Sequence, residues 1–362
     1  MSKKIVKLGV VGLKRGCDVT LTAIGMDGAK LCAACDRNPE VLEKAKKRYE
    51  AKGLYDCTYY TDYDEMLKSD IDAVFVATDA VYHVPIVKKA MEAGKHVLSE
   101  IPPINSVEEA YELKQIVASH PDLIYMAGEN CCYWAFIETW KRMRENGDFG
   151  EVVFAEAEYL HSTNPDEITP EKYADKNYWR NYNPAIKYIT HELGPLLYIM
   201  DDRCVSVTCM EPDVVYNPYI ERKSVGLALI KTAKGAVVRI LISFGAYTGC
   251  DHNYRVCGTR GQIETDHLTS VRTAHSYANL HSVPGTFEKK IEIPVSLAYE
   301  GEGTDGDHGG ADRKMLADFV ACVAENRKPI LDVDFGINMA IPGILAHESA
   351  VKGGMPMEIP QI

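Results

Sequence analysis

The 362-residue sequence has no apolar run long enough to span a membrane, no block of lysine and arginine, and no low-complexity stretch. A spanning helix needs about 20 consecutive apolar residues, so we expect no membrane partner. With no basic block and a formal net charge of −12, we expect no nucleic-acid partner either. The N-terminal MSKKIVKLGVVGL is too short and too valine-rich for a signal peptide. It predicts a β-strand, and we expect a cytoplasmic protein.

The eleven cysteines lack the spacing of a zinc site. Cys32 and Cys35 form a C-x-x-C inside the apolar run LCAAC, with no second pair at ligand distance, and Cys131 and Cys132 are adjacent in an aromatic segment. An odd number of cysteines in a chain expected to be intracellular favours reduced thiols packed as small hydrophobic side chains. We therefore predict no metal and no disulfide framework.

The length favours two domains, and the first alternates strands with helices. The strands are apolar on both faces, which is typical of a parallel sheet covered by helices on both sides. We predict a doubly wound α/β domain over residues 1–128. Its main strands are expected at 4–13, 30–36, 72–78, 96–100 and 123–129, and its helices at 17–27, 39–53, 62–68, 83–94 and 107–120.

Past Glu129 the pattern changes to long strands with alternating polarity. A helix at 134–147 precedes them, and a hairpin turn is expected at Thr232–Gly235. We predict an α+β domain over residues 129–362 with a large, mostly antiparallel sheet and helices near 311–326 and 334–353. Such a sheet must cover its second face, which favours a homo-oligomer formed through it.

The segment GVVGLKRG follows the first strand with Gly9, Gly12 and Gly16. Glycines after a strand permit a tight turn and the close approach of a dinucleotide diphosphate. Lys14 occupies a place where the fingerprint often has glycine, so the motif is weak by itself. The candidate cofactor-binding residues of this region are Gly12, Lys14, Arg15, Asp36 and Arg37.

Asp36 ends the second strand, where a carboxylate can accept hydrogen bonds from both adenosine ribose hydroxyls. Its charge would repel a 2′-phosphate, which favours NAD over NADP. Arg37 next to it keeps NADP as the less favoured alternative. The competing interpretation is that Asp36 only caps the helix that follows.

The run DAVFVATDAVYHVPIVKKAMEAGKHVLSEIPP at 72–103 resembles the glucose–fructose oxidoreductase, inositol dehydrogenase and rhizopine-catabolism (Gfo/Idh/MocA) family. The likeness includes Ala77-Thr78, His83, Gly94-Lys95-His96-Val97 and Glu100-Ile101-Pro102, and extends to CDRNPE, YTDYDEML, GDFGEV and HGGAD. It implies the same two-domain fold, NAD-dependent oxidoreductase activity, and cofactor contacts at Thr78, His83, Glu100 and Pro102.

The family's E-K-P motif commonly places a lysine beside the nicotinamide and the reacting hydroxyl. In this chain the position is Ile101, which has no proton chemistry, so another group must act as base. Glu100 could contact the nicotinamide ribose or amide, or relay a proton.

The motif KYITHELGP at 187–195 is similar to the Y-x-T-H-x-L-G-P of the branch that contains NAD-dependent glycosidases. Tyr188 and His191 are three positions apart, so on a helix they share a face. Histidine titrates near neutral pH and suits removal of a hydroxyl proton, so we predict catalytic roles for His191, Tyr188 and Glu100. The alternative is a buried histidine bonded to a backbone carbonyl.

Tyr159, His161 and His308 match positions that line the sugar pocket in that branch. The loop KNYWRNYNP adds Trp179 and Arg180, aromatic and basic groups suited to a sugar. Trp179 could equally serve packing. The predicted substrate-binding residues are Tyr159, His161, Trp179, Arg180 and His308.

Three functions remain open. The first is an NAD-dependent dehydrogenase that oxidises a ring hydroxyl of a sugar or glycoside, at C3. The alternative is a glycoside hydrolase that oxidises C3 transiently, eliminates the group on C1, adds water and returns the hydride. A catalytically silent NAD-binding regulator ranks last, because only the missing lysine favours it.

Overall fold

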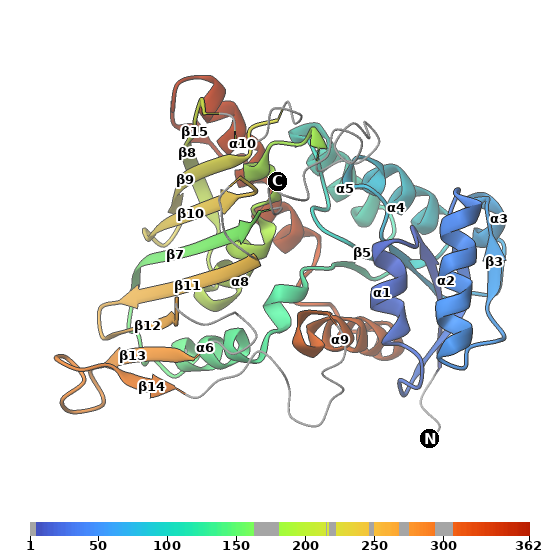
Figure 1. Cartoon of the computed structure of the whole chain (residues 1–362), viewed down its shortest axis with the longest axis horizontal. Helices are drawn as coiled ribbons and strands as arrows, with labels where there is room; N and C mark the ends of the chain where they lie inside the picture. Colours follow the sequence, from blue (N-terminus) through green and yellow to red (C-terminus); the bar gives the residue numbers. More distant parts are fainter. Residues whose placement is uncertain are drawn as a thin grey trace. The chain divides into compact units, whose positions relative to one another are not determined.

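The structure is a computed structural model that describes residues 5–162, 181–214, 216, 222–245, 250–267, 275–293 and 307–362 (Figure 1). The chain forms two compact units. The first comprises residues 1–130, 305–337 and 362, and the second comprises residues 131–304 and 338–361.

The first unit contains a six-stranded sheet in the order β3-β2-β1-β4-β5-β6, in which every pair is parallel. This order confirms the predicted doubly wound fold. The strands are β1 (Val6–Val11), β2 (Ala29–Cys35), β3 (Thr58–Tyr60), β4 (Ala73–Val76), β5 (His96–Ser99) and β6 (Tyr125–Ala127). The connecting helices are α1 (Arg15–Leu21), α2 (Pro39–Ala51), α3 (Tyr63–Leu67), η1 (Ala80–Tyr82), α4 (His83–Glu92) and α5 (Val107–Ala118).

Local sequence explains these boundaries. The side chains of Asn38, Asp62 and Ser106 accept hydrogen bonds from backbone N–H groups in the first turns of α2, α3 and α5. All four residues of β4 are fully buried, as expected for a central parallel strand. The helix expected at 17–27 already ends at Leu21, and Gly25 and Gly28 then take positive φ angles in the turns leading to β2.

The helix α9 (Ala311–Glu325) belongs to the first unit by its contacts, although the sequence analysis assigned residues 129–362 to the second domain. It contacts α1 and β1. Arg313 Nη1 donates to the carbonyl oxygen of Thr22 at 2.7 Å. The chain therefore returns to the Rossmann sheet near its end and adds a helix to it.

The second unit contains a nine-stranded sheet in the order β14-β13-β12-β11-β7-β10-β9-β8-β15. Among the described strands of this sheet, only β7 and β10 pair in parallel, which confirms the mostly antiparallel prediction. The strands are β7 (Val152–His161), β8 (Cys204–Met210), β9 (Val225–Thr232), β10 (Val237–Ser243), β11 (Cys250–Gly258), β12 (Gly261–Thr265), β13 (Ser276–Leu280), β14 (Ile291–Ile293) and β15 (Met357–Glu358).

Helices α6 (Ala135–Glu145) and α8 (Thr190–Met200) pack against each other, and α8 contacts β7 and β11 (Figure 1). The remaining elements are η2 (Asn130–Tyr133), η5 (Ala185–Tyr188), η7 (Asp307–Gly310) and α10 (Val333–Val351). The α8 helix is nearly all buried, so its polar residues must find partners inside the protein.

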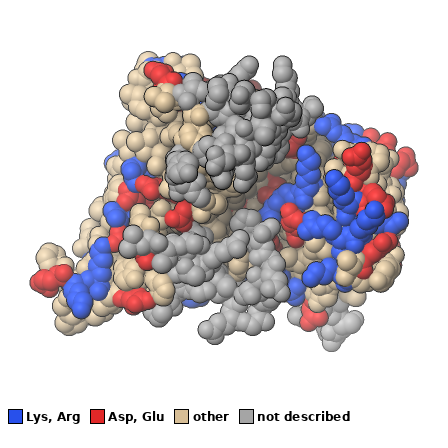
Figure 2. Space-filling model, in the orientation of Figure 1, with Lys and Arg blue, Asp and Glu red and all other residues tan. Residues whose placement is uncertain are grey.

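Among the described residues, no helix combines the length and apolarity needed to cross a membrane. Figure 2 shows acidic and basic side chains interspersed on the face drawn. Exposed ion pairs of the first unit include Lys89–Asp64 and Lys68–Glu65.

Candidate functional site

The glycine turn after β1 passes close to the neighbouring strand β4. Gly12 has a φ of +87°, and a Cβ added there would lie 2.5 Å from the carbonyl oxygen of Ala77. Its N–H donates to Cys35 O at 2.9 Å. Only glycine can occupy such a position without moving the backbone. The turn therefore has the bare backbone surface that the diphosphate of a dinucleotide needs.

Asp36 lies at the carboxyl end of β2 and braces this turn. Its carboxylate accepts from the backbone N–H of Leu13 and of Asn38, both at 2.9 Å. The side chain that caps α2 is Asn38, so Asp36 has a different role from the capping considered above. A carboxylate oxygen has two lone pairs, so each can accept a second hydrogen bond from a ribose hydroxyl. The turn at Gly12 thus fits the diphosphate of NAD, and the carboxylate of Asp36 fits its adenosine ribose.

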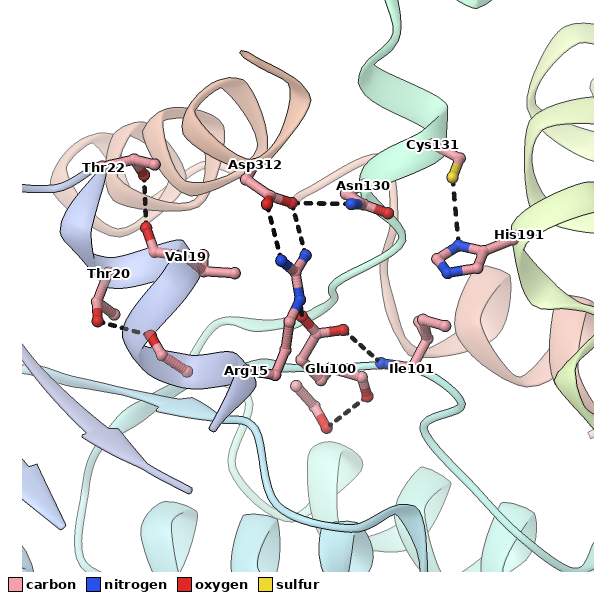
Figure 3. A network of polar contacts seen from close by, with 12 residues as sticks. Arg15, Val19, Thr20, Thr22, Glu100, Ile101, Asn130, Cys131, His191 and Asp312 are labelled. Atoms are coloured by element: carbon pink, nitrogen blue, oxygen red, sulfur yellow. Dashed lines mark hydrogen bonds and ion pairs between the residues drawn. The ribbon is translucent and has the colours of Figure 1, made fainter. Parts of the chain in front are cut away.

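Arg15, expected to bind cofactor, forms ion pairs with two carboxylates (Figure 3). Its Nε donates to Glu100 Oε1 at 2.9 Å, and its two terminal nitrogens donate to Asp312 at 2.8 and 2.7 Å. Asn130 donates to the same Asp312 at 2.8 Å. This network ties the glycine turn to the end of β5 and to α9. The neighbouring Lys14 is exposed.

His83 is buried, and its two ring nitrogens lie 2.9 Å from the carbonyl oxygens of Pro102 and Thr78. Burial lowers the pKa of this imidazole, and the two carbonyls oppose that effect. His83 thus holds together two segments that we predicted to contact the cofactor. The guanidinium of Arg37 lies over the Tyr82 ring, 5.5 Å from its centroid.

The Glu100 side chain is oriented from both sides. One oxygen pairs with Arg15, and the other accepts from the backbone N–H of Ile101 at 3.2 Å. Ile101 itself is buried and is followed by a cis bond to Pro102. Its apolar side chain cannot replace the proton chemistry of a lysine.

In the second unit, His191 lies between a phenol and a thiol. Its Nε2 is 3.1 Å from Tyr188 Oη, and its Nδ1 is 3.2 Å from Cys131 Sγ. Tyr254 Oη donates to the His191 backbone carbonyl at 2.7 Å. All four side chains are buried. The ring nitrogens of His191 face the side chains of Tyr188 and Cys131, whereas those of His83 face backbone carbonyls.

Tyr159 is the centre of a ring cluster in the same unit. Its ring stacks on His252, with centroids 4.3 Å apart, and makes an edge contact to His191 at 5.5 Å. Among the described residues, the rings of His161, Tyr188 and Phe244 also lie within 6.0 Å of it. Aromatic side chains together with a few polar groups are the residue types that commonly contact small molecules.

A buried acid–base pair next to this cluster was not predicted from the sequence. Glu192 is fully buried, and its Oε1 lies 2.6 Å from His252 Nδ1. Glu192 follows His191 within the THELGP motif, but nothing in the sequence links it to His252, which faces Tyr159 across the β7–β11 pair. The sequence likewise indicated no catalytic or binding role for Cys131 or Asp312, although Asp312 ends the HGGAD motif that is part of the family resemblance. Trp179, Arg180 and the His308 side chain lie outside the described residues.

Comparison with known families gives three matches. Residues 6–128 match the oxidoreductase family with NAD-binding Rossmann fold, Gfo/Idh/MocA. Residues 137–264 match the Gfo/Idh/MocA C-terminal domain, and residues 219–362 match the glycosyl hydrolase 109 C-terminal domain.

Similar proteins include glycosyl hydrolase family 109 protein 4 of Phocaeicola vulgatus, 28% identical over 91% of this chain and 72% of the relative. A glycosyl hydrolase family 109 protein of Streptomyces filamentosus is 27% identical over 99% of this chain and 77% of the relative.

Solved structures show the shared fold. A levoglucosan dehydrogenase in complex with NADH and levoglucosan has a TM-score of 0.85 at 19% identity and covers 99% of this chain and 100% of its own. A scyllo-inositol dehydrogenase from Lactobacillus casei with bound NAD(H) and scyllo-inositol has a TM-score of 0.77 at 20% identity, covering 98% and 99%. With the glycine turn, Asp36 and both domain matches in agreement, the chain belongs to the Gfo/Idh/MocA oxidoreductase family and has its NAD-binding Rossmann domain.

Proposed function

We propose that this protein oxidises a ring hydroxyl of a sugar or glycoside, at C3, with NAD as the hydride acceptor. The observation that carries the proposal is the buried contact of Tyr188 with His191, surrounded by the rings around Tyr159. This arrangement supplies a proton acceptor in a chain whose E-K-P lysine is replaced by Ile101.

The contact between Tyr188 and His191 provides a path for the proton of the substrate hydroxyl. The phenol of Tyr188 gives its proton to Nε2 of His191 as it takes the proton of the substrate hydroxyl. The C3–H bond breaks as the C=O bond forms, and two electrons leave with the hydrogen. NAD, when bound, supplies the nicotinamide C4 that receives them.

The remaining roles are proposed on the same basis. Glu100, held by Arg15, contacts the nicotinamide ribose or amide, and Thr78, His83 and Pro102 shape the neighbouring backbone. Tyr159 and His161 contact the sugar. His308 is proposed to do so from the HGG motif, and Trp179 and Arg180 from the chemistry of their side chains.

A hydrolase is the second candidate, and the match of residues 219–362 to the glycosyl hydrolase 109 domain favours it. In that reaction the C3 ketone acidifies the C2 hydrogen, a base removes it, and the group on C1 leaves. Water then adds and the hydride returns to C3. The cofactor ends in its starting state, so there is no net oxidation.

Nitrophenyl glycosides with excess NAD separate these functions, because NADH and free nitrophenol can be followed together. NADH that accumulates with turnover supports the dehydrogenase. Nitrophenol released without NADH supports the hydrolase. Bound NAD with neither product would reject both, and undiminished turnover of His191→Ala would reject the assigned base.

We further propose a homo-oligomer formed through the outer face of the nine-stranded sheet. Leu227 and Leu229 of β9 are exposed there. Beside them, Arg239 pairs with Glu156 and Glu158. A face with apolar groups and both signs of charge suits a second copy of itself. Light scattering should give a multiple of the chain mass for the native protein and a smaller mass for Leu229→Glu.

A further inference from the structure

Both ring nitrogens of His191 face polar side chains. Its Nδ1 faces the sulfur of Cys131 at 3.2 Å, and its Nε2 faces the phenol of Tyr188 at 3.1 Å. Cys131 is fully buried and Tyr188 nearly so. Figure 3 shows the thiol and the imidazole pointing toward each other. The cysteine lies in η2, sixty positions from the histidine, so the contact is a product of the fold.

A neutral imidazole donates from one nitrogen and accepts at the other. A thiol is a weak donor and a weak acceptor, whereas a phenol is a strong donor. The stronger hydrogen bond therefore runs from the Tyr188 hydroxyl to Nε2. The hydrogen of the imidazole is then on Nδ1, and the Cys131 sulfur accepts it.

We propose that Cys131 is the positioning residue of the base: its sulfur receives the Nδ1 hydrogen of His191 and keeps the lone pair on Nε2, toward Tyr188. This assignment rests on the proposed function for its catalytic consequence, but the tautomer is a property of the protein alone. The carboxylate of Glu192 pairs with a different imidazole, that of His252. The ring centroids of His252 and His191 are 6.0 Å apart.

The tautomer is tested by long-range ¹H–¹⁵N NMR of the full chain labelled with ¹⁵N-histidine. His191→Gln identifies the signals of this ring by their loss. We expect the Nδ1–H tautomer in the native protein and in Cys131→Ser, and a mixture of tautomers in Cys131→Ala. The Nε2–H tautomer in the native protein, or an unchanged spectrum in Cys131→Ala, would overturn the proposal.

The catalytic consequence is tested by steady-state measurement of kcat and KM for the same variants. Cys131→Ala should lower kcat about tenfold with KM nearly unchanged, and Cys131→Ser should restore most of it. The matched control is Cys132→Ala, which removes a neighbouring buried thiol and should leave kcat near the native value.

A kcat of Cys131→Ala equal to that of the native protein would refute the positioning role. If no glycoside is turned over by the native protein, the proposed function fails while the NMR result still settles the tautomer.

Discussion

The phenol oxygen of Tyr188 lies 3.1 Å from Nε2 of His191, and both side chains are buried in the second unit. A hydrogen bond shielded from water is electrostatically stronger than an exposed one. The two residues are three positions apart, where η5 ends and α8 begins, so one short segment delivers both groups. This pair is the most direct test of the proposed chemistry.

Tyr188→Phe should lower kcat by about 10²–10⁴-fold, because the phenyl ring keeps the packing against Tyr159 but cannot pass a proton. KM should change little. Steady-state kinetics with the best glycoside measures both. Tyr277→Phe on β13 is the matched control and should behave like the native protein. A Tyr188→Phe enzyme within twofold of native would exclude the proton path.

Arg15→Met should destabilise the first unit, because it leaves the buried carboxylates of Glu100 and Asp312 without their cation. Removing one partner of a buried pair costs about 3 kcal/mol. Thermal unfolding should show a clear loss of Tm. Lys89→Met breaks the exposed pair with Asp64 and should cost about 0–1 kcal/mol. Equal losses in the two variants would contradict this account of the network.

Asp36→Asn should weaken NAD binding by about tenfold or more, because hydrogen bonds to a charged acceptor contribute about 1.5–3 kcal/mol. The loss of charge should also reduce the discrimination against NADP. Titration calorimetry with both cofactors measures the two effects. Asp27→Asn, at an exposed position, serves as control. Unchanged NAD affinity in Asp36→Asn would remove Asp36 from the ribose site.

Stability should fall in acid through His83. Burial lowers the pKa of this imidazole below its ordinary 6.5, so between these two pKa values the unfolded chain binds a proton that the folded chain does not. The contribution is full above about pH 6.5 and is lost as the pH falls toward the folded pKa. Urea unfolding of the native protein and of His83→Gln measures it.

The His83→Gln variant should show a flatter pH dependence below about pH 6.5, whereas His281→Gln, at an exposed position, should follow the native curve. If His83→Gln shows the same loss of stability in acid as the native protein, His83 is not its source.

The fold could be predicted because its determinants are local and repeated. Apolar runs such as AVFV, alternating with capped helices, require a covered parallel sheet, and the long alternating strands after residue 151 require a sheet with two different faces. The contacts of α9 with α1 and β1 could not be predicted, because about 290 residues separate Arg313 from Thr22.

Residues of the candidate site could be predicted where they belong to one short sequence motif. Tyr188 and His191 come from one segment, and Gly12 and Asp36 from one strand–turn–helix unit. The partners of these groups were not predictable. Cys131 was expected only as a packed hydrophobic side chain, and Arg15 was expected to bind cofactor without the carboxylate of Asp312.

The chain itself, through periodicity, glycine placement and motif spacing, determined a Rossmann unit, an antiparallel sheet and the identity of the groups that carry proton chemistry. The tertiary structure alone decided which distant side chain faces each of them: Cys131 for His191, His252 for Glu192, Asp312 for Arg15. The physical reason is that a hydrogen bond depends on a few ångströms of distance and on direction, and residues far apart in sequence acquire both only when the whole core has packed.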